Sequence, residues 1–256
     1  MTAELEPPGT GDVQGRAALR KVARRLIPFL CLLYAFNILD RANVGFARTE
    51  MERDLGMSPQ VFDLGYGLFY LGYLAFEVPS NLLLRRFGAR RWIGRIMISW
   101  GLVSCATAAV NDAWTFYSVR VLLGVAEAGF FPGIILYLTY WFPSRERAGA
   151  TAYFMFAIAL ASVFGNPLSG SIMQYLGGAV GLQGWQWLFV LEGLPSIVLG
   201  VVVLYRLPDR PADAGWLTED ERAWLVDRLR REEQERQQRV GARTGWWRCW
   251  TGASGC

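Results

Sequence analysis

The chain has no histidine among its 256 residues, and its only lysine is Lys21. Without histidine, haem proteins, His-ligated metal enzymes and the commonest side-chain proton shuttle are excluded. Because Lys21 lies outside the long apolar segments, a Schiff base within a membrane bundle is excluded too. The usual sequence sign of ATP-driven transport, a GxxxxGK[ST] loop, is also missing. If the chain moves protons, carboxyl groups must carry them, and the candidates are Asp40, Glu77, Glu127 and Glu192.

The chain has few cysteines, and their positions predict neither a disulfide framework nor a metal site. Cys31 and Cys105 lie in apolar segments, while Cys249 and Cys256 lie close to the C-terminus, and no CxxC pair occurs. We therefore expect no metal and no cofactor. No short apolar core with a small-residue cleavage site opens the chain, so we expect no secretory signal peptide. Residues Met1–Gly15 are polar and rich in proline and glycine, which predicts disorder.

Long apolar runs are abundant, since 53% of the residues are hydrophobic and only 19% are charged. A membrane-spanning helix needs about 20 mostly apolar residues. The qualifying segments are roughly Leu26–Phe46, Leu64–Leu84, Trp92–Val110, Trp114–Trp141, Ala148–Leu176 and Gln186–Tyr205. The sequence therefore predicts an all-α membrane protein with a six-helix bundle over residues 26–205.

The regions that flank the predicted bundle are polar. Residues 1–25 form an N-terminal tail, and residues 206–256 form a linker, a helix and an atypical C-terminal tail. Thr218 and Glu221 have the spacing of a capping box, which predicts the start of a helix. Leu225 and Leu229 belong to a short apolar stripe that makes this helix amphipathic.

Arginines gather in every second connection between the apolar segments. The clusters are Arg16, Arg20, Lys21, Arg24 and Arg25; Arg85, Arg86, Arg90, Arg91 and Arg95; Arg145 and Arg147; and Arg206 and Arg210. This alternation is the positive-inside pattern, so we expect both termini in the cytoplasm and a multi-pass protein of the bacterial cytoplasmic membrane. We interpret the basic clusters as topology signals, and we expect no nucleic-acid partner.

Two of the apolar segments contain ionised side chains. Asp40 and Arg41 lie in the first segment, and Arg120 and Glu127 lie in the fourth. A charge near the bilayer centre costs ~2.5–3.5 kcal/mol on insertion scales. Such residues face a cavity or a partner, so by default they mark a substrate or ion path.

The predicted topology places Arg41 and Arg120 at a similar depth, each ~10 Å below the outer face. Two unpaired arginines would repel each other, and an anion between them would relieve this because the guanidinium fork matches a carboxylate. Glu127 is seven residues from Arg120, on the same helix face and near mid-membrane. Asp40 and Arg41 point about 100° apart, so one faces the cavity and the other reaches a neighbouring helix.

The same charges have a second explanation, a static ion-pair network that only locks the helices together. Such networks are costly to bury and are weak evidence of stability. Tyr73 is open to both interpretations, because it can donate to an anion or simply pack.

The residues around these charges resemble the major facilitator superfamily, and specifically its anion:cation symporter family. The matching strings are LDRANVG, FEVPSNLLLRRFGARRW, RVLLGVAEAGFFPGIILYLTYWFPSRERA, GNPLSG and WQWLFVLEGLP, within about Leu26–Leu229. The resemblance implies import of organic anions such as sugar acids, tartrate or phthalate, together with protons. By position it implies that Arg41, Arg120 and Tyr73 bind substrate and that Asp40 and Glu127 couple to protons.

The sequence departs from the family in two respects. The motif GxxxDRxGRR of the second connection has Asn81 and Arg85 at its glycine and aspartate positions, while Arg86, Gly88 and Arg90 remain. The family's fold has two six-helix halves, and we expect this chain to contain only the N-terminal one, with a C-terminal half as a missing partner. The final string GARTGWWRCWTGASGC does not resemble a seventh span, and we interpret it as an out-of-frame read-through.

The leading interpretation is therefore half of a proton-coupled organic-anion symporter embedded in the lipid bilayer. The alternative from another class is a non-transporting membrane scaffold or inactive fragment whose charges are structural. A membrane-embedded enzyme is disfavoured because histidine and any nucleophile–base pair are missing.

Overall fold

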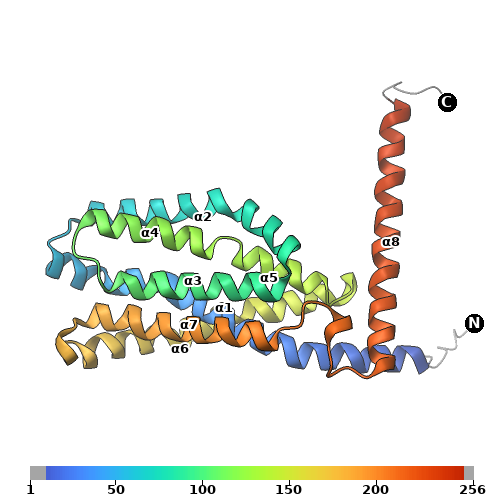
Figure 1. Ribbon diagram of the computed structural model, residues 1–256, viewed down its shortest axis with the longest axis horizontal. Helices are drawn as coiled ribbons and strands as arrows, with labels where there is room; N and C mark the ends of the chain where they lie inside the picture. Colours follow the sequence, from blue (N-terminus) through green and yellow to red (C-terminus); the bar gives the residue numbers. More distant parts are fainter. Residues whose placement is uncertain (1–9, 251–256) are drawn as a thin grey trace, which may run out of the picture.

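The computed structural model describes the backbone of residues 10–250 and the side chains of residues 15–239. Within that range the chain is almost entirely helical (Figure 1). The α-helices are α1 (Thr10–Leu55), α2 (Pro59–Phe87), α3 (Ala89–Thr107), α4 (Ala113–Glu127), α5 (Phe130–Thr139), α6 (Ser144–Leu176), α7 (Gly184–Arg206) and α8 (Glu219–Trp250). Short 3-10 turns, η1 (Ala179–Gly181) and η2 (Pro211–Asp213), lie in the connections on either side of α7.

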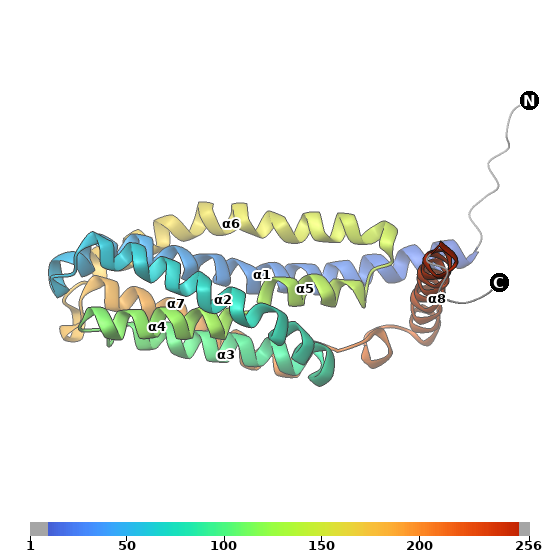
Figure 2. The ribbon, with the colours of Figure 1, turned by 90° about the horizontal axis from the view of Figure 1, so that it is seen from above.

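Five stretches are long and apolar enough to cross a membrane: Gly15–Leu55, Pro59–Phe87, Ala113–Thr139, Ser144–Leu176 and Gly184–Arg206. They contain four of the six predicted segments and all but the last two residues of a fifth, Trp114–Trp141, and they run side by side in both views of the bundle (Figure 2). The remaining segment forms α3, whose first two turns carry Arg90, Arg91 and Arg95 and leave only a short apolar stretch. α3 nevertheless belongs to the bundle, since it packs against α4 and α7.

The N-terminal helix α1 begins earlier than the sequence predicted. The expectation of disorder is wrong for Thr10–Gly15, which form its first turns, whereas Met1–Gly9 lie outside the described residues. Gly15 lies against the indole ring of Trp224 on α8, where a side chain would not fit. Packing against a second helix therefore orders a segment whose composition alone favours disorder.

Glycines allow α3 and α7 to pack backbone against backbone. A Cβ atom added to Gly101 of α3 would lie 2.8 Å from the carbonyl oxygen of Gly193 on α7, closer than real Cβ contacts allow. Two turns away, a Cβ on Gly94 would lie 3.1 Å from the carbonyl oxygen of Gly200. Small residues that permit such an approach are the usual means of helix association in membranes.

The fourth predicted span is broken into two helices. α4 ends at Glu127, and α5 begins at Phe130 after Gly129, whose φ of 82° is left-handed. Glycine adopts that conformation at no steric cost, and a Cβ at this position would also meet the Cβ of Ser80 at 2.7 Å. The expectation of one continuous helix over Trp114–Trp141 is wrong at this point, and the break places Glu127 at a helix end.

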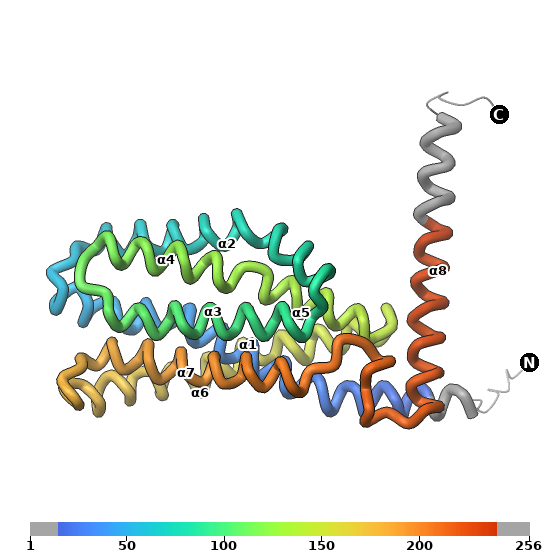
Figure 3. Tube along the Cα trace, in the orientation of Figure 1, coloured from blue at the N-terminus to red at the C-terminus, as the bar shows by residue number. Residues whose placement is uncertain are grey.

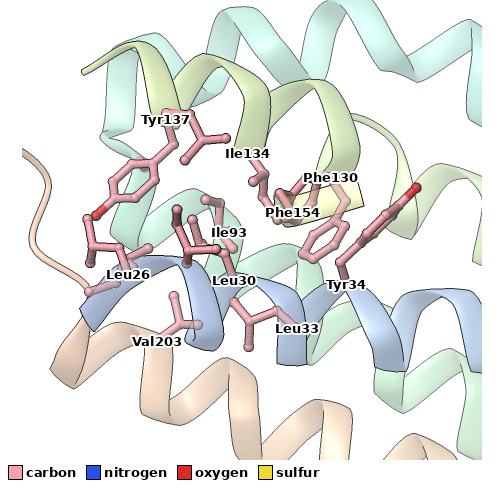
Figure 4. Packing of buried hydrophobic residues seen from close by; sticks show 14 of the residues in the cluster. Leu26, Leu30, Leu33, Tyr34, Ile93, Phe130, Ile134, Tyr137, Phe154 and Val203 are labelled. Atoms are coloured by element: carbon pink, nitrogen blue, oxygen red, sulfur yellow. The ribbon is translucent and has the colours of Figure 1, made fainter. Parts of the chain in front are cut away.

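The bundle has two apolar cores, one toward each end. The larger is drawn in part in Figure 4 and contains Leu26, Leu30, Leu33, Ile93, Trp100, Phe130, Ile134 and Val203. The smaller contains Val44, Met51, Phe62, Phe116, Trp185 and Phe189. On α1, buried polar and charged residues at positions 37, 40 and 43 lie between the two cores. We call the buried polar and charged residues between the cores the polar layer.

The last helix, α8, lies at the end of the bundle where α1 starts and points away from its axis (Figure 3). The predicted capping box is confirmed, since the Thr218 amide donates to Glu221 at 2.9 Å and the Glu221 amide donates to Thr218 at 3.3 Å. Leu225 of its apolar stripe belongs to the larger core. Lys21 of α1 forms an ion pair with Glu221 at 2.9 Å, which fixes the two helices to each other.

Candidate functional site

Of the four ionised residues predicted in the first and fourth segments, Asp40, Arg120 and Glu127 belong to the polar layer, and Arg41 borders it with a partly exposed side chain. Glu127, at the end of α4, is fully buried and accepts a hydrogen bond of 2.8 Å from Arg41 Nε on α1. The same carboxylate oxygen accepts a second hydrogen bond of 2.8 Å from Asn37 Nδ2, one turn earlier on α1. The hydrogen-bond partners of Glu127 are therefore Arg41 and Asn37 of the neighbouring helix α1.

Arg120 is buried in the same layer without an ion pair. Only 2% of the residue is exposed, and its guanidinium carbon lies 4.6 Å from the ring centroid of Phe69 and 5.6 Å from that of Tyr66. Its Nε and Nη1 atoms have no hydrogen-bond partner within the described part of the chain. Aromatic faces attract a guanidinium group but leave its donors unsatisfied.

The two arginines meet at one aromatic ring. The guanidinium carbon of Arg41 lies 5.5 Å from the centroid of Phe69, the ring that Arg120 also faces. Arg41 contacts Tyr73 as well, at 4.8 Å from its ring centroid. The side chain of Arg41 is 28% exposed, whereas Arg120 is enclosed. The arrangement brings two cations to one aromatic ring, and one of them, Arg41, is paired with Glu127.

Close packing of α2 on α4 holds these aromatic rings in place. A Cβ on Gly124 of α4 would lie 3.0 Å from the backbone nitrogen of Tyr73, and one on Gly72 would lie 2.8 Å from the carbonyl oxygen of Val121. Because the backbones approach this closely, Phe69 and Tyr73 are delivered to the face of α4 that carries Arg120. The small residues around Glu127 in the sequence thus serve helix packing.

Asp40 has its hydrogen-bond partner on a different helix from the partner of Arg41. Its carboxylate accepts a hydrogen bond from Ser104 of α3, and only 1% of the residue is exposed. This is the division that the angle between adjacent helical residues predicted, with Arg41 facing α2 and α4 and Asp40 reaching another helix. The structure therefore separates the two candidate proton carriers, Asp40 and Glu127, onto different sides of α1.

Sequence reasoning missed Asn37, Phe69 and Ser104. Asn37 carried a usable signal, because it is a polar residue one helical turn before Arg41 in an apolar run. Phe69 and Ser104 carried none, since a phenylalanine or serine in a membrane helix is ordinary.

The family model for the Major Facilitator Superfamily matches residues 30–254. The chain belongs to the major facilitator superfamily. It is a multi-pass membrane protein of transporter lineage rather than an enzyme, and the charged layer lies within a facilitator bundle.

Among its relatives, a protein named as a tartrate transporter from Agrobacterium vitis is 54% identical over 89% of this chain and 50% of its own length. The metabolite transport protein NicT of Pseudomonas putida is 49% identical over 86% of this chain and 50% of its own length. The chain thus spans about half the length of the curated relatives it matches.

A solved facilitator structure has the same fold. A bacterial homologue of the human lysosomal transporter Spinster, crystallised in an inward-facing and occupied conformation, superposes with a TM-score of 0.60. The match covers 73% of this chain and 44% of the other at 20% sequence identity. At that identity the likeness concerns the fold alone, which is the six-helix half predicted from the sequence.

Proposed function

We propose that this chain provides half of a secondary transporter for organic anions, with Arg41 and Arg120 as its carboxylate-binding residues. The observation that carries the proposal is the state of Arg120, a buried cation whose Nε and Nη1 find no hydrogen-bond partner among the residues described. A buried charge without compensation is costly. A carboxylate that accepts both donors would remove that cost, and the planar fork suits it.

Arg41 completes the anion site. Its Nε is engaged by Glu127, while its Nη2 has no partner among the residues that the structure describes. The Arg41 side chain is 28% exposed while Nη2 itself is buried, so an anion would have to enter the layer beside Arg41 to contact this nitrogen. A substrate carboxylate that binds here competes with Glu127 for Arg41, and protonation of Glu127 would release the arginine for it. That exchange is our proposed basis for proton coupling, with Tyr73 flanking the site through its contact with Arg41.

The name of one relative agrees with an anionic substrate and supplies a first probe. Tartrate carries two carboxylates, and a relative that is 54% identical over most of this chain is named for it. We therefore propose small carboxylates of this kind as the substrate class.

The test is binding of tartrate to the purified chain in lipid nanodiscs, measured by calorimetry and by thermal shift. Tartaric diamide, which keeps the hydroxyl groups but has no charge, is the matched ligand control. We expect tartrate to bind and the diamide not to bind. A ligand at 100 times its Kd stabilises the folded state by about 2.7 kcal/mol, so the thermal shift is measurable.

Arg120→Met separates this proposal from a structural role for the charges. Replacing a buried unpaired cation by an apolar residue of similar length is neutral or stabilising, by about 1 kcal/mol or more. We expect the variant to lose tartrate binding while its unfolding temperature stays equal or rises. Arg53→Gln, at a side chain that is 75% exposed on the same helix as Arg41, should leave both unchanged. Intact binding in Arg120→Met would contradict the proposal.

The second candidate function is a non-transporting scaffold, favoured by the Arg41–Glu127 ion pair that joins α1 to α4. It predicts that Arg120→Met and wild type differ only in stability and that neither binds carboxylates.

A further inference from the structure

The polar layer continues toward α3, α6 and α7, where two more carboxyl groups are buried. Glu192 of α7 is 3% exposed and accepts a hydrogen bond of 2.7 Å from Ser169 of α6. Asp40 of α1 accepts one from Ser104 of α3. Neither carboxyl group forms an ion pair within the described residues. We call Asp40, Asn43, Ser104, Ser169 and Glu192 the α1–α7 cluster.

Asn43 is a further buried polar residue of this cluster. It follows Asp40 by three residues on α1, so the two share a helix face. Asn43 is completely buried. In the part of the chain that is described, both its amide atoms, Asp40 Oδ2 and Glu192 Oε2 have no hydrogen-bond partner. Four unsatisfied polar atoms in one buried place are unusual for a native structure.

Protonation of Glu192 removes the buried charge from this region. A neutral Glu192 carries an O–H group, and a donor is what the unpaired acceptor oxygens of this region lack. An ionised Glu192 offers no donor and leaves a buried charge without a cation, which is the costlier arrangement.

We propose that Glu192 is a proton-carrying residue of this protein. The step is a proton transfer alone, in which the O–H bond of Glu192 breaks and the proton passes to water with no electron transfer. The cluster would be the second proton site, separate from Glu127. Only the role of this proton in transport rests on the proposed function. Protonation of Glu192 itself can be measured without transport.

The contact between α3 and α7 does not depend on the cluster. Gly101 and Gly193 already bring α3 and α7 into backbone contact directly beside Glu192. What the cluster joins is the helix pair α1–α6 to the pair α3–α7, because its members come from all four helices. The other charged or titratable groups around Asp40 are Glu127, Arg120 and Cys105. Loss of the proton leaves two buried negative charges here and would loosen α1 from α7, the helix that carries Glu192.

The test is infrared spectroscopy of the purified chain in lipid, in the carbonyl stretching band of protonated carboxylic acids. We expect Glu192→Gln to remove one component of this band at neutral pH. Glu221→Gln, at an acid that is ion-paired on α8, should leave the band unchanged. Ser169→Ala keeps the carboxyl group but removes its hydrogen-bond donor, so it should shift the same component to higher frequency. This second variant keeps the test valid if Glu192→Gln fails to fold.

Two results would overturn the proposal. A band that is insensitive to both Glu192→Gln and Ser169→Ala means that Glu192 is ionised. A component that disappears when sodium is added at constant pH means that the cluster binds a metal cation instead of a proton. Both readouts are independent of transport, so absence of tartrate binding or counterflow would count against the proposed function and leave this result standing.

Discussion

At the scale of single residues, the Arg41–Glu127 ion pair determines how much a substitution at Arg41 lowers the free energy of unfolding. Removing one partner of a buried ion pair costs about 3–5 kcal/mol because the other charge stays buried and unpaired. Arg41 is partly exposed, whereas Glu127 is enclosed. We therefore expect Arg41→Ala to lower the free energy of unfolding by about 3 kcal/mol, the lower end of that range. Chemical unfolding in mixed micelles would measure it.

A double substitution gives the control for this prediction. Arg41→Ala combined with Glu127→Gln removes the stranded charge, so we expect it to recover at least about 1 kcal/mol of the loss. Strict additivity of the two single effects would show that the residues do not interact in the folded protein.

The same residues show what sequence reasoning can and cannot give. The pairing of Asp40 with one helix and Arg41 with another followed from the 100° step of the helix, and the structure bears out that geometry. The partner of Glu127 did not follow, because the spacing along one helix identifies a shared face but says nothing about which neighbour covers it. Glu192 was a candidate only because histidine is missing and few carboxyl groups lie in the apolar segments. Its contact with Ser169 could not be predicted, because Ser169 lies on a different helix and sequence spacing does not show which helices are neighbours.

At the scale of elements, the contact between α3 and α7 depends on the absence of side chains. A Cβ at Gly101 would lie 2.7 Å from Ile197 Cγ1 and 2.8 Å from the Gly193 carbonyl oxygen, so any larger residue pushes the helices apart. Overpacking of this kind costs about 1–3 kcal/mol. We expect Gly101→Val to lose at least that much stability, measured by thermal unfolding in detergent.

Gly170 of α6 is the matched control, because a Cβ there meets nothing within 4 Å. Gly170→Ala should keep or raise the unfolding temperature, since alanine favours the helix by roughly 1 kcal/mol. If both substitutions had the same effect, the close approach of α3 and α7 would not be what limits stability.

The contact between α1 and α8 should respond to acid. The hydrogen bond from Lys21 lowers the pKa of Glu221 below its usual value, and the Thr218 backbone amide acts in the same direction. A carboxyl group with a depressed pKa stabilises the docked state above its unfolded pKa of about 4.3, and this contribution is lost as the pH falls through the depressed value. We expect α8 to undock from α1 only below that pH.

Spin labels at the exposed positions Ala17 and Ala223 would report this undocking as a longer distance. In Glu221→Gln the acid-dependent change should vanish, because glutamine does not titrate. Glu219 is exposed and lies two residues before Glu221, so Glu219→Gln should keep the acid-dependent change. A transition near neutral pH in wild type would contradict the assignment to Glu221.

At the scale of the whole molecule, the sequence predicted the bundle well and its interruptions poorly. Segment positions follow from the length and apolarity that a membrane imposes, so all predicted spans correspond to helices. The helix break at Gly129 and the helical turn at Thr10 depend on neighbours, Ser80 in one case and Trp224 behind Gly15 in the other. Local composition does not predict contacts between distant parts of the chain.

The chain spans about half the length of its curated relatives, and this sets the last prediction. Alternating access in facilitators is a rocking of one half against the other around a site between them. Here both arginines belong to one half, so we expect the purified chain to bind tartrate but to show no saturable counterflow in proteoliposomes. Co-reconstitution with the C-terminal half of the Agrobacterium vitis relative should restore counterflow, and Arg120→Met should abolish it again. Saturable counterflow by the chain alone, shown to be a monomer, would mean that a single six-helix half can expose its site to both faces.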